Sequence, residues 1–208
     1  MKMAITRRLL LLGTSALALI GSLPRMAAAQ GTRARVTFVL VSDIYLMSDQ
    51  PGPDGQLRGG YARLASVVKA ERAKGGHVLF VHAGDALSPS LMSSLDRGEH
   101  VINLTNRLAP DIFVPGNHEF DFGKELFFQR MREAKFPLYV ANILNPDGTL
   151  IAGFRERNIF DIGGVRIGIT AATDEDAAIL SSPGDLKFPR SVETIEKQAT
   201  TLRKEGAD

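Results

Sequence analysis

Residues 116–123 combine side chains that could bind a metal ion with others that could move a proton; they read Gly-Asn-His-Glu-Phe-Asp-Phe-Gly. Asn117 offers a carbonyl oxygen to a metal, and the imidazole of His118 gains or loses a proton near neutral pH. Asp121 could accept an N–H bond from that ring and so fix its tautomer. A plain turn also uses Asn, Asp and Gly, but a histidine among them favours a reactive site.

This segment and two aspartates each follow a short apolar run that is typical of a buried strand. The three runs are residues 36–41, 78–81 and 112–114, and the aspartates that follow the first two are Asp43 and Asp85. In α/β proteins, ligands gather at the carboxyl ends of strands. We therefore expect these side chains to meet at one edge of a sheet. Serines near Asp85 lack a base partner, so a serine nucleophile is not expected.

The remaining pattern alternates helices with strands, which favours an α/β fold. Helices are predicted over residues 61–74, 90–108 with an interruption at Gly98, and 124–135. A further strand is predicted over residues 138–141, and a hairpin over 158–162 and 165–170. Ser191 is predicted to cap a last helix, whose apolar face would carry Val192, Ile195, Ala199 and Leu202.

The segments around Asp43, Gly84-Asp85 and Gly116-Asn117-His118-Glu119-Phe120-Asp121 resemble the motifs of the calcineurin-like metallophosphoesterases. They are similar to those of the periplasmic 5'-nucleotidase and UDP-sugar hydrolase branch. The resemblance covers about residues 35–208 and implies a four-layer α/β/β/α sandwich that is incomplete at the C-terminus. It also implies two divalent metal ions, with Mn, Zn, Mg, Fe and Ca all left open.

The resemblance assigns a role to each motif residue. Asp85 would bridge the two metals, Asp43 would bind the first and Asn117 the second. His118 would contact the phosphoryl group and the leaving oxygen, oriented by Asp121, so that Asn117 and His118 also bind substrate. Such a metal pair lowers the pKa of a shared water from 15.7 to about 7 and stabilises charge in the transition state.

Tyr45 departs from the family pattern, which has Asp-x-His where this chain has Asp43-Ile44-Tyr45. A phenol with a pKa near 10 must ionise to bind a metal well, which at pH 7 costs about 4 kcal/mol. A subset of the family carries tyrosine here, so ligation by Tyr45 stays open.

The family supplies three more histidines from a Gly-His and a Gly-His-x-His motif, and a C-terminal domain for the substrate base. The chain does not contain them, so residues 30–208 are expected to be the N-terminal part of such a domain. His77, His82 and His100 are expected to be structural or solvated. Two weaker candidates are the Gly59-Gly60 segment and the acidic run 174–176, which could be a helix start and a solvated loop.

Residues 1–29 have the features of a secretory signal peptide with paired arginines, Arg7 and Arg8, before a modest apolar run. Cleavage near Ala29 would follow export by the twin-arginine translocase, so a periplasmic location is expected. An uncleaved anchor is the alternative, but the run is short and contains glycine. Without this leader, 21 Lys and Arg face 23 Asp and Glu, and we expect no nucleic-acid partner.

The expected activity is metal-dependent hydrolysis of phosphate esters through a dinuclear metal centre that is incomplete in this chain, with a nucleotide as the small-molecule substrate. Two alternatives stay open. One is a related thiosulfohydrolase of sulfur oxidation, which shares the fold and the export route, and the other is a non-catalytic remnant that binds one metal weakly or none.

Overall fold

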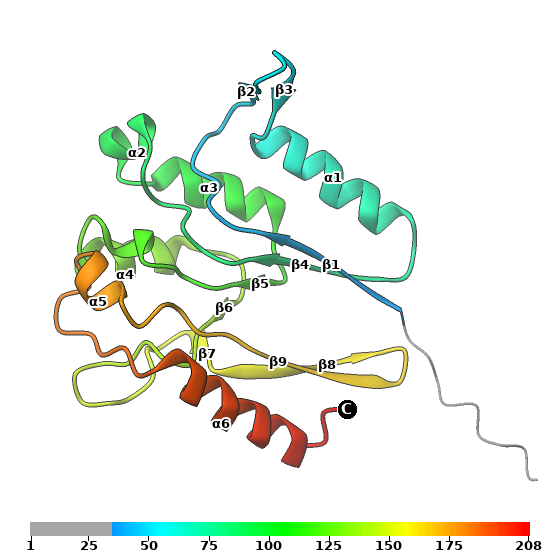
Figure 1. Cartoon of the computed structure of the whole chain (residues 1–208), viewed down its shortest axis with the longest axis vertical. Helices are drawn as coiled ribbons and strands as arrows, with labels where there is room; N and C mark the ends of the chain where they lie inside the picture. The colour runs from blue at the N-terminus through cyan, green and yellow to red at the C-terminus, as the bar shows by residue number, and fades with distance from the viewer. Residues whose placement is uncertain (1–34) are drawn as a thin grey trace, which may run out of the picture. The chain divides into compact units, whose positions relative to one another are not determined.

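A five-stranded parallel sheet forms the centre of the computed structural model, which describes residues 35–208 (Figure 1). The signal-peptide prediction for residues 1–29 lies outside these residues. The strands, in their order across the sheet, are β1 (Val36–Val41), β4 (His77–His82), β5 (Ile112–Phe113), β6 (Leu138–Tyr139) and β7 (Phe154–Arg155). Neighbouring strands are parallel, with Val36 opposite His77 and Val41 opposite His82. Their carboxyl ends therefore lie at one edge of the sheet.

Helices connect β1 to β4, β4 to β5 and β5 to β6, as the alternating pattern predicts, and a loop connects β6 to β7. They are α1 (Tyr61–Ala73), α2 (Leu91–Asp96), α3 (Glu99–Leu108), the short 3-10 helix η1 (His118–Phe120) and α4 (Lys124–Glu133). The predicted interruption at Gly98 is confirmed, because Arg97 and Gly98 both adopt left-handed backbone angles between α2 and α3. The strand predicted over residues 138–141 is shorter than expected and ends at Tyr139.

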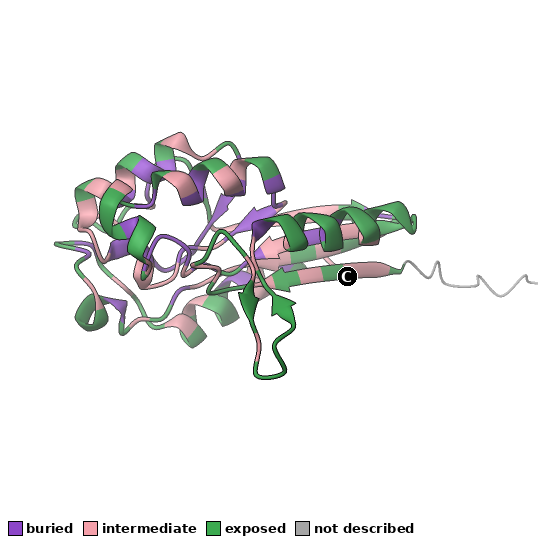
Figure 2. Cartoon of the chain, turned by 90° about the horizontal axis from the view of Figure 1, so that it is seen from above, coloured by how far each residue is buried: buried purple, intermediate pink, exposed green. Residues whose placement is uncertain are grey.

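A second, two-stranded sheet lies on the other side of the central sheet from α1 and α3 (Figure 1). It is the predicted hairpin, formed by β8 (Arg157–Ile162) and β9 (Val165–Thr170) in antiparallel register. Helix α6 (Ser191–Lys204) packs on this hairpin, and the short helix α5 (Ala177–Leu180) precedes it. The order helix, sheet, sheet, helix gives the α/β/β/α layering. A small hairpin of β2 (Gln50–Pro51) and β3 (Leu57–Arg58) stands apart (Figure 2).

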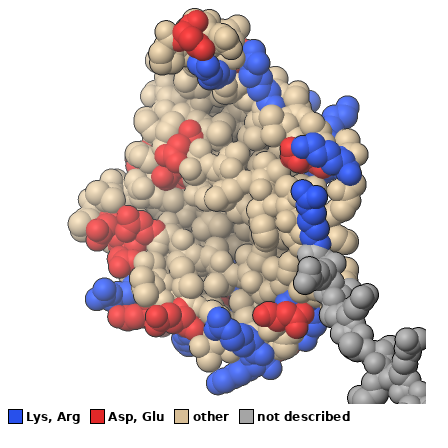
Figure 3. Space-filling model, turned by 45° about the vertical axis from the view of Figure 1, so that its right-hand side comes forward, with Lys and Arg blue, Asp and Glu red and all other residues tan. Residues whose placement is uncertain are grey.

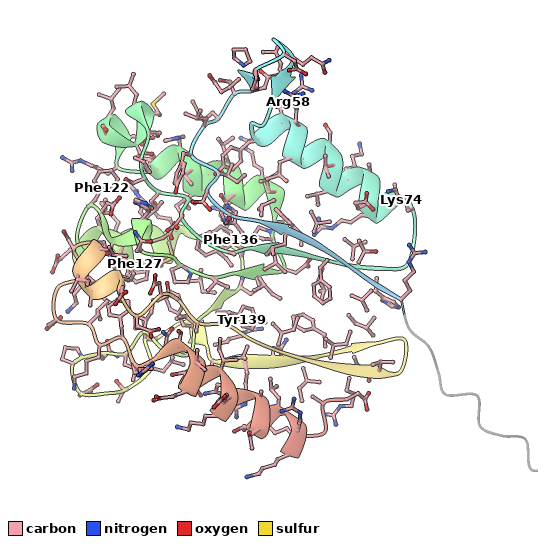
Figure 4. All side chains as sticks on the ribbon, in the orientation of Figure 1. Arg58, Lys74, Phe122, Phe127, Phe136 and Tyr139 are labelled. Atoms are coloured by element: carbon pink, nitrogen blue, oxygen red, sulfur yellow. The ribbon has the colours of Figure 1, made fainter. Side chains whose placement is uncertain are left out.

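Aromatic side chains fill the core between the central sheet and its helices. Phe120 of η1 and Phe127 of α4 have ring centroids 4.2 Å apart, and Phe113 of β5 lies 5.0 Å from Phe136. Figure 4 shows Phe127, Phe136 and Tyr139 in the interior, and buried residues concentrate in the same region in Figure 2. Since η1 carries the reactive segment, the packing of Phe120 fixes that segment to the core.

The prediction for the last helix is wrong in two respects. Ser191 is the first helical residue, and its backbone N–H and hydroxyl both donate to the carboxylate of Glu175. The acidic loop therefore caps α6, which gives Glu175 a structural role. The predicted apolar face also differs, because Val192 is 63% exposed and Ile195 is 41% exposed. The face that packs inward carries Leu202 and the buried amide of Gln198.

The surface shows no single dominant charge on the face drawn in Figure 3. Acidic and basic side chains lie around the margin of this face, and its centre carries neither. Among the helices that the structure describes, none combines the length and the apolar character needed to cross a bilayer.

Candidate active site

The predicted site residues follow three neighbouring strands and lie at the same edge of the sheet. Asp43 follows β1, Asp85 follows β4, and Asn117 and His118 follow β5. Because β1, β4 and β5 are adjacent and parallel, their following loops meet. The structure thus brings together the residues that the sequence predicts.

Two glycines allow the loops after β4 and β5 to approach each other closely. A Cβ atom on Gly84 would lie 2.4 Å from the backbone nitrogen of Gly116 and 2.5 Å from the carbonyl oxygen of Val114. A Cβ on Gly116 would lie 2.2 Å from a carboxylate oxygen of Asp85. Gly84 also has a φ of +83°, which favours glycine. Any side chain at either position would push the predicted metal ligands apart.

Both predicted aspartate ligands adopt a backbone conformation that is costly for residues other than glycine. Asp43 has a φ of +59° and Asp85 a φ of +54°, in the left-handed region. Aspartate tolerates this region better than most residues, but the conformation still costs about 1–2 kcal/mol. The backbone N–H of Asp43 donates to the carbonyl of Gly84 at 3.1 Å, which ties the two turns together. Backbone strain of this kind clusters at functional sites.

The carboxylate of Asp85 lies half-buried between the other acidic groups of the site. It accepts a hydrogen bond of 3.0 Å from the backbone N–H of His118. Burial raises the pKa of Asp85 above its usual value, and the charges of Asp43 and Asp121 raise it further, although the bond from His118 acts the other way. A cation beside Asp85 would favour the ionised carboxylate.

His118 is the first residue of η1, and it forms a hydrogen-bonded pair with Asp121, which directly follows η1. Nδ1 of His118 lies 2.7 Å from Oδ2 of Asp121, and the same carboxylate oxygen accepts a 2.7 Å hydrogen bond from the hydroxyl of Ser88. A carboxylate partner at Nδ1 places the proton there and leaves Nε2 available for another group. Burial acts to lower the pKa of His118, but the hydrogen bond and charge of Asp121 outweigh it, so the pKa is raised.

Tyr45 contacts two of the predicted site residues. Its hydroxyl donates to Oδ1 of Asp43 at 2.8 Å, and its ring meets the His118 ring edge to face at a centroid distance of 5.9 Å. Hydrogen bonds from Ser42 and Tyr45 lower the pKa of Asp43. Burial, followed by the bond to Asp43, raises the pKa of Tyr45 far above its usual value. Tyr45 therefore lies beside the predicted ligands as a hydrogen-bond donor to Asp43.

The oxygen donors at this edge fit part of a site for a hard divalent cation. Asp43 and Asp85 supply carboxylates and Asn117 supplies an amide, which are the ligand types that Mg²⁺, Ca²⁺ and Mn²⁺ favour. Within residues 35–208, no three His, Cys, Asp or Glu side chains come together as a metal-binding group. The two carboxylates and the amide would therefore supply part of the ligand set of such an ion.

The other histidines have structural surroundings. His82 is fully buried on β4, and its Nδ1 accepts a 3.2 Å bond from the backbone N–H of Gly84. Burial lowers the pKa of His82 to about 4, so the ring stays neutral. His100 pairs with Asp96 at 2.7 Å between α2 and α3, and His77 is exposed at the start of β4. None of the three joins the predicted ligands.

Sequence reasoning gave no role to two residues that shape the site. Ser88 binds Asp121, and the buried Glu119 binds the backbone of the loop that carries Asp85. For Glu119, the available signal is a charged residue directly before Phe120, which packs in the core. A carboxylate drawn into a core needs hydrogen-bond donors there.

Comparison with known proteins identifies the class to which this fold and site belong. The calcineurin-like phosphoesterase family matches residues 36–202, so the chain belongs to that family. Snake venom 5'-nucleotidase from Gloydius brevicauda is 32% identical over 185 residues, which cover 83% of this chain and 31% of that protein. The chain spans about a third of the length of such curated relatives.

Solved structures show the same architecture. The NAD nucleotidase of Haemophilus influenzae superposes with a TM-score of 0.76 at 26% identity, covering 83% of this chain and 32% of that one. A 5'-nucleotidase precursor from Thermus thermophilus gives a TM-score of 0.74 at 26% identity, covering 83% and 35%. The prediction of a metallophosphoesterase fold with 5'-nucleotidase relatives is confirmed.

Proposed function

We propose that this chain carries the reactive edge of a hydrolase that cleaves phosphate esters of nucleotides through two divalent metal ions. The observation that carries the proposal is the meeting of Asp43, Asp85, Asn117 and the His118–Asp121 pair at the carboxyl ends of three adjacent strands. Family membership and relatives named as 5'-nucleotidases support the choice of substrate class.

Each residue has a task in this proposal that its position supports. Asp85 would hold both ions, Asp43 the first and Asn117 the second. Bound divalent ions polarise phosphoryl oxygens and make a water molecule acidic enough to attack at neutral pH. His118 would direct Nε2 toward the phosphoryl group and the leaving oxygen, because Nδ1 is held by Asp121. The raised pKa of His118 favours a ring that can donate a proton from Nε2.

We also propose that the protein acts in the periplasm after export by the twin-arginine translocase. The support is the pair Arg7-Arg8 ahead of an apolar run and small residues before Gln30. That route carries folded proteins, which suits an enzyme that binds its metal before export.

Metal binding and hydrolysis by matched variants test the function. The chain is titrated with Mn²⁺ and assayed with 5'-AMP, and the wild type is compared with Asp85→Asn and His118→Ala. We expect Asp85→Asn to lose metal affinity, and His118→Ala to keep it while any hydrolysis slows at least tenfold. Exposed Asp161 on β8 provides the matched control, since Asp161→Asn should change neither quantity.

Three results would contradict the proposal. Unchanged Mn²⁺ affinity in Asp85→Asn would remove the metal site from this edge. Hydrolysis of a sulfur-carrier thiosulfonate in place of 5'-AMP would favour the thiosulfohydrolase alternative, and absence of both metal binding and hydrolysis would favour a non-catalytic remnant.

A further inference from the structure

Glu119 is a fully buried carboxylate that binds the backbone of two separate loops. Its side chain lies on η1 and is only 1% exposed. Oε2 accepts hydrogen bonds from the N–H of Asp85 at 2.9 Å and of Gly116 at 2.6 Å. Oε1 accepts from the N–H of Ala86 at 2.7 Å and of Leu87 at 3.3 Å. The four donors match the roughly four acceptor sites of one carboxylate.

The loop after β4 is built around this carboxylate. The N–H groups of residues 85, 86 and 87 are consecutive, and all three point at Glu119. Successive backbone N–H groups of this kind form a concave anion-binding nest, which here holds a side chain of the same protein. The preceding N–H, that of Gly84, is taken by His82. The nest fixes the left-handed turn at Asp85 and so the direction of its side chain.

The contact is reciprocal. While Glu119 holds the backbone of Asp85, the carboxylate of Asp85 accepts from the N–H of His118, which is adjacent to Glu119. Asn117 and His118 therefore cannot shift relative to Asp85 without breaking bonds in both directions. One bond of Glu119 also reaches Gly116, at the point where the two loops are closest.

We infer that Glu119 is a positioning residue that holds Asp85 in register with Asn117 and His118 for the metal and phosphoryl site. This inference rests on the proposed function of that site. Glu119 itself is fully enclosed, so it acts through the backbone and does not contact a metal or a substrate. Carboxylates that orient ligands in this indirect way typically change metal affinity by about 10–100-fold when they are mutated.

Glu119→Gln tests the inference with little change in shape. A glutamine amide keeps one acceptor oxygen but turns an NH₂ group toward backbone N–H donors, so part of the nest loses its partner. We expect Mn²⁺ affinity to fall at least tenfold and the absorption spectrum of bound Co²⁺ to change. We also expect the amide proton resonances of Asp85, Ala86, Leu87 and Gly116 to move upfield. Glu119→Asp, which keeps the charge with a shorter reach, should give smaller changes of the same sign.

Arg130 offers a matched control, because it is also a buried charged side chain that holds a loop by its backbone. It is 5% exposed, and it donates to the carbonyl oxygens of Asp96 and Arg97 at 2.9 Å each. Arg130→Gln should lower the melting temperature while Mn²⁺ affinity and the Co²⁺ spectrum stay as in the wild type.

Three results decide between the inference and its alternatives. The inference is overturned if Glu119→Gln folds and binds Mn²⁺ within twofold of wild type with an unchanged Co²⁺ spectrum. It is equally overturned if Arg130→Gln loses as much metal affinity for the same loss of melting temperature. If the wild type itself binds no Mn²⁺, the proposed function fails, and the amide resonances still show whether Glu119 holds the loop. Should Glu119→Gln fail to fold, Glu119→Asp decides by the same criteria.

Discussion

The phenol of Tyr45 donates a 2.8 Å hydrogen bond to the carboxylate of Asp43, the residue expected to bind the first metal. The donor holds its proton, since burial and the neighbouring carboxylate both raise the pKa of Tyr45. A metal that binds Asp43 would compete with this hydrogen bond for Oδ1. The structure therefore shows Tyr45 as a hydrogen-bond donor to Asp43, and a metal bound at Oδ1 would have to displace it.

Tyr45→Phe should bind Mn²⁺ at least as tightly as the wild type, because only the competing donor is lost. Asp85→Asn should weaken Mn²⁺ binding by about tenfold or more, since it removes a carboxylate at the centre of the site. Isothermal titration calorimetry, with elemental analysis after dialysis, measures both. Tyr139→Phe, which removes a phenol from the core away from the site, controls for loss of packing. Weaker binding in Tyr45→Phe than in the wild type, with Tyr139→Phe unchanged, would show that the phenol is a ligand.

The arrangement of the predicted ligands follows from features that the sequence displays. Three apolar runs of strand type precede Asp43, Asp85 and Asn117, and parallel strands put their carboxyl ends at one edge. Glycine stands at both points where the two loops approach, but only the structure shows that Gly84 and Gly116 meet. What these local patterns share is that each depends on residues close together in the chain.

The contacts that hold the ligands in place depend on residues far apart in the chain, so local patterns do not reveal them. Glu119 and the N–H of Asp85 are 34 residues apart, and Ser88 and Asp121 are 33 apart. A carboxylate in a turn is normally solvated. Only the packing of η1 against the β4 loop shows that this one is buried.

The last helix shows how polar contacts can override apolar periodicity. Its inward face includes Gln198, whose amide donates to Glu156 at 3.0 Å and accepts from Arg157 at 2.9 Å. This arrangement turns Val192 and Ile195 outward. The sequence pattern predicts an amphipathic helix correctly but not the direction of its buried face.

Asp96 should make stability depend on pH through the junction of α2 and α3. Its carboxylate accepts from the N–H groups of Gly98 and His100 and pairs with the His100 ring. Burial acts to raise the pKa of Asp96, but these bonds outweigh it and lower the pKa from its usual value of 3.8. Because the pKa is lowered in the folded state, the contribution of Asp96 to the free energy of unfolding is complete above the usual pKa of 3.8. It is lost as the pH falls through the lower pKa of the folded state.

Asp96→Asn should therefore destabilise the chain by about 1–2 kcal/mol at pH 7 and by progressively less below about pH 4. Urea unfolding of wild type and variant between pH 3 and 7 measures the difference. Asp161→Asn, on the exposed side of β8, serves as the control and should show no such trend. A constant difference across this range would mean that the charge of Asp96 does not stabilise the junction.

Export should depend on the paired arginines that the sequence places before the apolar run. Replacing both by lysine, Arg7→Lys with Arg8→Lys, keeps the charge but removes the pair that the translocase reads. We expect the double variant to remain in the cytoplasm as an uncleaved chain, measured by cell fractionation and mass spectrometry. Arg25→Lys, in the same leader, is the matched control and should be exported normally. Recovery of the double variant from the periplasm at its mature size would rule out this route.

The carboxylate of Asp121 should set the tautomer of His118. Nδ1 of His118 and Oδ2 of Asp121 lie 2.7 Å apart, and the Ser88 hydroxyl holds the same oxygen. Asp121→Asn replaces a pure acceptor by an amide, so the ring should lose its preference for a proton on Nδ1. Ser88→Ala removes one donor and leaves the carboxylate, so the preference should weaken without disappearing. Nitrogen-15 chemical shifts of the ring report the tautomer directly, without any assay of hydrolysis.

The chain contains a second Asp–His pair that provides the control for this experiment. Asp96 and His100 also lie 2.7 Å apart but stand outside the site, so Asp96→Asn should change the tautomer of His100 and leave His118 as in the wild type. In a hydrolysis assay, Asp121→Asn should lower the rate about 10–100-fold with Mn²⁺ affinity unchanged, because its contact is with the ring and not with a ligand. An unchanged His118 ring in Asp121→Asn would show that another group sets its tautomer, and the proposed proton transfer through Nε2 would lose its structural basis.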